Sequence, residues 1–281
     1  MQTGNGIFLL VVTILYGLLV TCGALFFRKK ELFSSTVYWL TVVTGIFHAF
    51  FIGTYTITTG HCLLTTGPEI FSLVAFTLLA TYLIVEVRSD TRFGATGLLV
   101  ISVSFLFQLA SAIGLWSQGT SEPNPIFLAP SFNIHVAASV FGYAALTLST
   151  IYGSLYLVLF RLIKKNNYGS LFNEVPSLSR LERYGLRALL VGFIFLSVSI
   201  LFGFLLIEKN FSAEEASQYF TDPKTIATLL IWLVFGITLL LHRFAKIEGR
   251  KLVLFWMSGY ALTLLSMTVI NSFVTEYHRF L

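Results

Sequence analysis

Residues 132–153 read FNIHVAASVFGYAALTLSTIYG, the pattern of the outer half of a membrane helix. A histidine, His135, stands about one turn inside its start. Small residues recur on the same face at spacings of three and four: Ala138, Ser139, Gly142, Ala145, Ser149 and Gly153. Residues at these spacings share a helix face, and small ones let helices approach closely in lipid. The stretch therefore predicts that His135 points into a helix bundle.

The composition places the whole chain in a membrane. Of 281 residues 56% are hydrophobic and 11% are charged, with a mean hydropathy of +0.83, whereas an ordinary globular domain is roughly 25% charged. Apolar runs of about 20 residues recur along the length, as a bilayer requires of a helix. We expect a single membrane domain over residues 1–281, in contact with the lipid bilayer and with no large soluble part.

Eight apolar segments predict an all-α integral membrane protein, a bundle of eight transmembrane helices. They are residues 7–27, 37–58, 69–87, 93–116, 132–163, 185–207, 224–244 and 252–276. Fifteen of the 18 basic residues fall in the loops after the first, third, fifth and seventh segments. By the positive-inside rule both termini are extracytoplasmic. Because the basic residues sort by loop, the net charge of +5 does not suggest nucleic acid.

Two loops carry helix signals of their own. Residues 175–184 mix leucine with arginine and predict a short amphipathic helix along the inner membrane surface. Ser212 and Glu215 have a capping-box spacing, with Phe211 ahead as a hydrophobic staple, which predicts a helix over 213–219. Cys22 and Cys62 lie in different contexts and indicate neither a disulfide framework nor a metal site.

Two histidines lie at the same predicted outer end of the membrane, His135 and His278. His278 follows the last segment, at the end of a polar stripe through Thr268, Asn271 and Thr275. Histidines on two bundle helices could bind both faces of one haem iron. The other interpretation is that His278 is an ordinary interfacial residue near the end of the chain.

His48 lies near the middle of the second segment, roughly 16 Å along the helix from its inner end. Thr44, Thr41 and Tyr55 share its face. It could be a way-station for a cofactor, a proton or a substrate, or a neutral histidine bonded to a neighbouring helix. His61 is expected to be solvated, and His242 to interact with a helix C-terminus.

Two acidic residues stand at predicted helix starts. Asp222 precedes Pro223, which is ordinary N-cap chemistry, and Glu69 follows Pro68, where the helix dipole favours a carboxylate. Taken alone, neither residue requires a function.

The second half resembles the membrane proteins of cytochrome c biogenesis, with CcsA of the system II pathway and its relatives CcmC and HemX. Four segments carry this resemblance: HVAASVFGYAAL from His135, Asp222-Pro223-Lys224 with LIWLVF at 230–235, Arg243 with Gly249-Arg250-Lys251, and Ile270-Asn271 with His278. Residues 132–281 match well, as a cytochrome c assembly-type core. The first half resembles the eight-span HemX- and YpjD-like branch.

The resemblance implies a non-covalent b-type haem, held stably or in transit at the extracytoplasmic face between the fifth and eighth spans. His135 and His278 would be its axial ligands, and His48 the residue of haem passage in the membrane. The outer loop would contribute Tyr219, Phe220, Asp222 and Trp232 to haem packing. Lys209, Lys224 and Arg279 are the basic residues on that side and would contact the propionates.

The same resemblance implies a bacterial cytoplasmic membrane, a CcsB-like partner with an extracytoplasmic domain, and apocytochrome c. The chain would be a subunit of a haem-attachment system rather than an enzyme by itself. One signature departs from the family: W-G-x-x-W-x-W-D should end at Asp222, but residues 217–221 are SQYFT, without tryptophan. An alternative is therefore a HemX-like, non-catalytic subunit that regulates or stabilises another complex without haem. A transporter or respiratory b-type subunit ranks below both.

Overall fold

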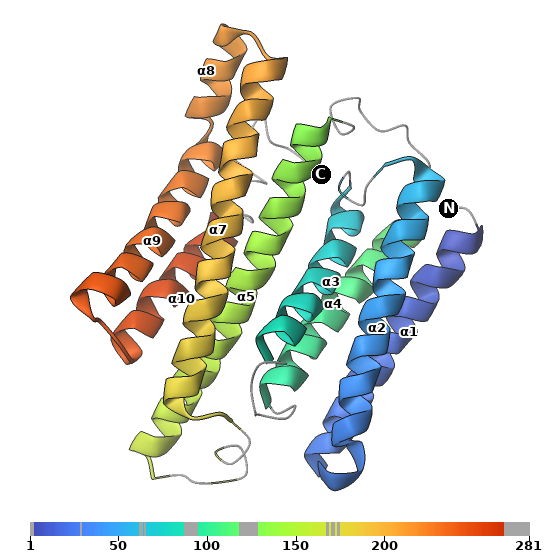
Figure 1. Cartoon of the computed structure of the whole chain (residues 1–281), viewed down its shortest axis with the longest axis vertical. Coiled ribbons are helices and arrows are strands. Elements are labelled where there is room, and N and C mark those ends of the chain that lie inside the picture. The colour runs from blue at the N-terminus through green and yellow to red at the C-terminus, as the bar shows by residue number, and fades with distance from the viewer. Residues whose placement is uncertain are drawn as a thin grey trace. The chain divides into compact units, whose positions relative to one another are not determined.

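The computed structural model describes residues 3–28, 30–61, 64, 66–86, 95–117, 129–166, 169, 172 and 175–266. All regular structure in these ranges is helical (Figure 1). The helices are α1 (Thr3–Arg28), α2 (Lys30–Thr59), α3 (Gly67–Glu86), α4 (Ala95–Ser117), α5 (Pro130–Lys164), α7 (Leu178–Asn210), α8 (Ala213–Thr221), α9 (Pro223–Ala245) and α10 (Arg250–Leu265).

Seven of these helices contain segments long and apolar enough to cross a membrane: α1 to α5, α7 and α9. They coincide with the first seven predicted spans, which confirms an integral membrane protein of helical class. The eighth predicted span, 252–276, is described as α10 up to Leu265, and its remainder lies outside the described residues. The eighth crossing and the sides of the two termini stay predictions.

The chain forms two compact units. Unit 1 comprises residues 1–129 with 167–176, and unit 2 comprises residues 130–166 with 177–281. In unit 1, α1 packs against α2 and α4, and α3 packs against α4. Along α1, Leu9, Val12, Tyr16 and Leu19 are buried, while Ile7, Leu10, Ile14 and Leu18 are exposed. Spacings of three and four thus separate a packed face from one suited to lipid.

Unit 2 is built on the antiparallel pair α5 and α7. Gly142 and Gly192 lie where the two backbones approach, since a Cβ on Gly192 would stand 3.1 Å from the carbonyl oxygen of Gly142. Farther along, the hydroxyl of Ser149 donates to the carbonyl of Gly185 at 2.9 Å. The predicted small-residue face of α5 therefore packs against a neighbouring helix, as expected.

Helix α10 is fixed to this pair by Trp256, which is fully buried. Its indole lies over two glycines: a Cβ on Gly153 of α5 would be 2.7 Å from its Nε1, and a Cβ on Gly185 of α7 would be 2.9 Å from its Cζ2. A second contact is the bond of 2.6 Å between the hydroxyls of Thr147 and Tyr260.

The predicted surface helix over 175–184 is wrong. Leu178–Tyr184 forms the first two turns of α7, which continues unbroken to Asn210. Leu181, Gly185, Ala188 and Leu189 are all buried, so the packed face of the membrane segment already begins in this amphipathic stretch. The predicted helix over 213–219 is confirmed as α8.

Gly153→Ala should destabilise the docking of α10. The new methyl group would overlap Trp256 and lie 3.2 Å from Cγ of Met257, and overpacking of this kind costs about 1–3 kcal/mol. The thermal unfolding midpoint of the detergent-purified protein measures the effect. Gly45→Ala is the matched control, because a Cβ there would have nothing within 4 Å. Equal midpoints for the two variants would contradict the proposed packing.

Candidate functional site

The imidazole of His135 is held by one nitrogen only. Its Nδ1 lies 2.8 Å from the backbone carbonyl oxygen of Ser199 and 3.2 Å from the hydroxyl of the same residue. A carbonyl oxygen can only accept, so the proton sits on Nδ1 and the lone pair is on Nε2. Among the described residues, Nε2 has no hydrogen-bond partner. His135 therefore presents a fixed tautomer with one open acceptor nitrogen.

Two residues of α7, Ser199 and Gly203, position this ring, and we call them the seat of His135. Gly203 follows Ser199 by one turn, and a Cβ on it would stand 2.9 Å from Nδ1 and 3.0 Å from Cε1 of His135. Any larger residue would push the imidazole away. The hydroxyls of Ser139 and Ser199 lie 2.6 Å apart and join α5 to α7 beside the ring. The sequence interpretation included Ser139 but missed Ser199 and Gly203, whose spacing of four was the available signal.

This arrangement fits an axial ligand of haem iron. A histidine that binds a metal usually donates its other ring N–H to a carbonyl or a carboxylate, which fixes its tautomer and its orientation. The bond from Nδ1 to Ser199 is of this kind. The predicted second ligand, His278, and the predicted propionate contact Arg279 lie outside the described residues.

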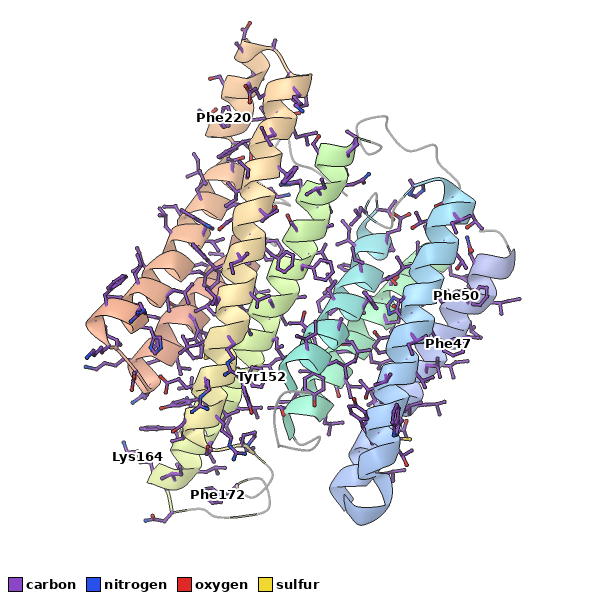
Figure 2. All side chains as sticks on the ribbon, viewed as in Figure 1. Phe47, Phe50, Tyr152, Lys164, Phe172 and Phe220 are labelled. Atoms are coloured by element: carbon purple, nitrogen blue, oxygen red, sulfur yellow. The ribbon has the colours of Figure 1, made fainter. Side chains whose placement is uncertain are left out.

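Helix α8 follows the end of α7, close to the seat of His135 along the chain. Tyr219 packs on Phe211 with ring centroids 4.5 Å apart, and Phe220 packs edge-on against Phe204 at 5.4 Å. Phe220 remains 43% exposed, and Figure 2 shows it on α8. These aromatic rings bind α8 to α7 and keep one apolar surface open.

The other residues predicted for the outer loop have defined local roles. Asp222 is the N-cap of α9, where its Oδ1 accepts from the backbone N–H of Lys224 at 2.8 Å. Trp232 donates from Nε1 to the hydroxyl of Ser197 at 2.8 Å and stacks on Phe193 at 5.3 Å, so it packs α9 against α7. Lys209 is exposed at the end of α7.

His48 lies in unit 1 and has a different environment. It is fully buried, and both ring nitrogens are hydrogen-bonded, Nδ1 to the hydroxyl of Tyr16 at 3.1 Å and Nε2 to the hydroxyl of Ser72 at 3.0 Å. No ring nitrogen of His48 is left for another partner. His242 bonds through Nδ1 to the carbonyl of Ile247 at 3.2 Å, at the end of α9 as expected.

Glu69 is buried near the start of α3. Its Oε1 accepts from the hydroxyl of Tyr55 at 2.8 Å, and its Oε2 accepts from the backbone N–H of Thr66 at 3.3 Å. The second bond has capping-box geometry, in agreement with the helix-start interpretation.

Comparisons with known proteins cover most of the chain. The CcsA cytochrome c biogenesis protein of Trieres chinensis is 24% identical over 273 residues, which cover 78% of this chain and 84% of that protein. Protein HemX of Bacillus subtilis is 23% identical over 147 residues, 52% of this chain and 51% of HemX. Inner membrane protein YpjD of Escherichia coli K12 is 25% identical over 130 residues, 46% of this chain and 47% of YpjD.

The chain thus spans about half the length of the HemX and YpjD relatives that it matches. A family model described as "Cytochrome C assembly protein" matches residues 63–278, far more than half of the sequence. The match includes the whole of α5, α7, α8 and α9, and with them the seat of His135. This chain belongs to the cytochrome c assembly protein family.

Proposed function

We propose that this membrane protein handles haem for cytochrome c assembly, at the end of unit 2 where α5 begins and α7 ends. One observation carries the proposal: His135 offers an open Nε2, while its Nδ1–H is committed to the carbonyl of Ser199. By the charge distribution of the loops, this end faces the extracytoplasmic side.

The chain's own residues would bind and orient the cofactor. His135 and His278 would hold the haem iron, and Ser199 and Gly203 would fix the ring of His135. Phe220 offers an exposed apolar surface, and Lys209 stands at the end of α7. Lys224 and Arg279 complete the set of cations on that side, which suit the propionates. A bound haem supplies redox chemistry and a vinyl-bearing ring, while the protein supplies ligation and orientation.

The chain would act with partners in this role. The names of the CcsA relatives refer to cytochrome c biogenesis. For this chain we infer apocytochrome c as the recipient and a CcsB-like membrane protein with an extracytoplasmic domain as the companion subunit. The YpjD relative is named an inner membrane protein, which favours the bacterial cytoplasmic membrane.

A second function is a HemX-like subunit that stabilises another membrane complex without haem. It is favoured by the outer loop, where residues 217–221 lack tryptophan. The rings of Tyr219 and Phe220 also pack against α7, so only part of their surface is open for stacking on a porphyrin.

Absorption spectra of the detergent-purified protein, oxidised and reduced, test the haem site directly. We expect a low-spin spectrum in the parent protein, because two imidazoles would bind the iron. The variants His135→Ala and His278→Ala should each change this low-spin spectrum or lose the haem absorption. A parent protein that takes up no haem, even when haem is added, would exclude the haem-handling function.

Gly203→Ala tests the seat without removing a ligand. Its methyl group would lie 2.9 Å from Nδ1 of His135 and break the bond to Ser199. Loss of such an orienting partner lowers metal affinity by about 10–100-fold. Haem titration monitored by absorbance gives the change, and Gly53→Ala, where a Cβ meets nothing within 4 Å, is the control. Unchanged affinity in Gly203→Ala would count against His135 as the ligand.

The double variant His135→Ala with His278→Ala separates the two functions in cells. If haem handling is the function, the level of membrane-bound holocytochrome c should fall to that of the deletion strain, provided immunoblotting finds the variant in the membrane. Normal cytochrome levels would instead support the haem-independent subunit.

A further inference from the structure

A continuous chain of hydrogen bonds through His48 joins α1, α2, α3 and α4, the described helices of unit 1. Tyr16 of α1 bonds to Nδ1 of His48 at 3.1 Å, and Nε2 bonds to Ser72 of α3 at 3.0 Å. Ser72 donates to Oε1 of Gln108 on α4 at 3.1 Å, and Nε2 of Gln108 reaches Thr13 of α1 at 3.4 Å. We call these five side chains the His48 chain.

Both ends of the His48 chain stop at backbone carbonyls. At one end the hydroxyl of Tyr16 also reaches the carbonyl oxygen of Ala75 at 3.3 Å, and at the other the hydroxyl of Thr13 donates to that of Leu9 at 2.8 Å. The chain therefore has six contacts. Its tyrosine, serine, threonine and glutamine side chains supply one hydrogen each for these contacts, and a neutral imidazole supplies one more. Five hydrogens serve six contacts.

The position of the missing hydrogen follows from the direction of the bonds. Ser72 gives its only hydrogen to Gln108, so Nε2 of His48 must donate to Ser72. In neutral His48, Nδ1 then carries no proton and can only accept. The hydroxyl of Tyr16 has one hydrogen, which it can donate either to Nδ1 or to the carbonyl of Ala75, but not to both. If His48 carries a second proton on Nδ1, that N–H donates to Tyr16, Tyr16 donates to Ala75, and all six contacts are made.

We propose that His48 is a proton-binding site in the membrane interior, coupled to the direction of the Tyr16 hydroxyl. A charge is costly in this apolar setting, so the neutral form is the resting state. The His48 chain lowers that cost by providing an acceptor for both N–H groups of the imidazolium. The ligand is a proton, and the reorientation of Tyr16 from His48 to Ala75 accompanies its binding.

The same geometry does not fit an iron ligand at His48. Both nitrogens are engaged, and aromatic rings of Tyr16, Phe51 and Phe76 surround the imidazole at centroid distances of 5.6, 6.1 and 5.4 Å. The sequence left open a way-station for a cofactor, a proton or a substrate, and a neutral histidine bonded to a neighbouring helix. The bonds to Tyr16 and Ser72 agree with the neutral, bonded histidine as the resting form, and among the way-station roles they favour the proton.

Tyr16 is the one titratable side chain that contacts His48 within the described part of unit 1. Other titratable groups whose side chains are described stand farther along these helices: Tyr38 and Tyr55 ten and seven residues from His48 on α2, Glu69 and Tyr82 three and ten residues from Ser72 on α3, and Cys22 six residues from Tyr16 on α1. The described length of α4 has none. Glu69 is thus the nearest acidic side chain along these helices.

Nitrogen NMR of histidine-labelled protein in nanodiscs tests the proposal. The full-length chain would carry glutamine in place of His61, His135, His242 and His278, which leaves one histidine signal and no haem ligand at the proposed haem site. We expect the neutral form protonated at Nε2 near neutral pH, and a doubly protonated form on acidification while circular dichroism shows an intact fold. A failure of the haem proposal leaves this readout unaffected.

Tyr16→Phe and Gln108→Leu, made in this single-histidine protein, probe the two sides of the imidazole. Loss of the Tyr16 oxygen removes a charge-assisted bond, so at the same acidic pH the ratio of protonated to neutral His48 should fall on the order of fivefold. Gln108→Leu frees the Ser72 hydroxyl to donate to Nε2 of His48. The single ring proton of the neutral imidazole should then move from Nε2 to Nδ1.

Thr44→Val is the matched control, because Thr44 is buried one turn from His48 and, among the described residues, its hydroxyl donates to the carbonyl of Leu40 within α2. It should leave the protonated fraction unchanged. Two results would overturn the proposal: a His48 that stays neutral at every pH at which the fold persists, or equal protonation in Tyr16→Phe and the parent.

Discussion

The lack of water in a bilayer is the constraint on which this structure depends. A polar group inside the hydrocarbon must find its partner within the protein. Most hydroxyls of the described helices do so locally, by donating to the carbonyl one turn back, as Thr41, Thr44 and Thr81 do. A polar side chain that cannot form a hydrogen bond within its own helix needs a partner on a neighbouring helix. His48 and His135 are of this kind, and each therefore fixes how its helix packs.

The two units meet this constraint differently. In unit 2 the close approach of α5 and α7 is made by glycine and serine, so helix backbones themselves become hydrogen-bond partners, as Gly185 is for Ser149 and Ser199 is for His135. In unit 1 longer side chains span the gaps between helices, and the partners are mainly other side chains. A backbone carbonyl fixes the orientation of His135, which favours binding of a metal. The hydroxyl groups of the His48 chain can reverse the direction of their hydrogen bonds, which favours binding of a proton.

Much of the fold follows from composition and spacing alone. Hydrophobic length located seven membrane helices, and the small-residue stripe located the packed face of α5, because both depend on local sequence. The separate surface helix was wrong because Leu181 and Gly185 continue the packed face into α7, a relation visible only once the partner helix is known. Ser199, Gly203 and the His48 chain were missed for the same reason. They are contacts between segments 24 to 95 residues apart. A local signal such as the spacing of four between Ser199 and Gly203 marks a helix face but does not specify the partner of that face.

Two histidines, the half-buried His135 and the fully buried His48, show why residue type does not settle a role in a membrane protein. Each lies on an apolar helix, and each resembles a cofactor ligand when its sequence neighbours alone are considered. The difference is the number of ring nitrogens that other helices engage. For His135 the carbonyl of Ser199 engages Nδ1, and Gly203 leaves space for the ring, so the Nε2 lone pair has no hydrogen-bond partner among the described residues. For His48 two hydroxyls engage both nitrogens. Among the described residues, no hydrogen bond to Nε2 of His135 has to be broken before a metal binds there, whereas a metal at His48 must break a bond that the bilayer cannot replace.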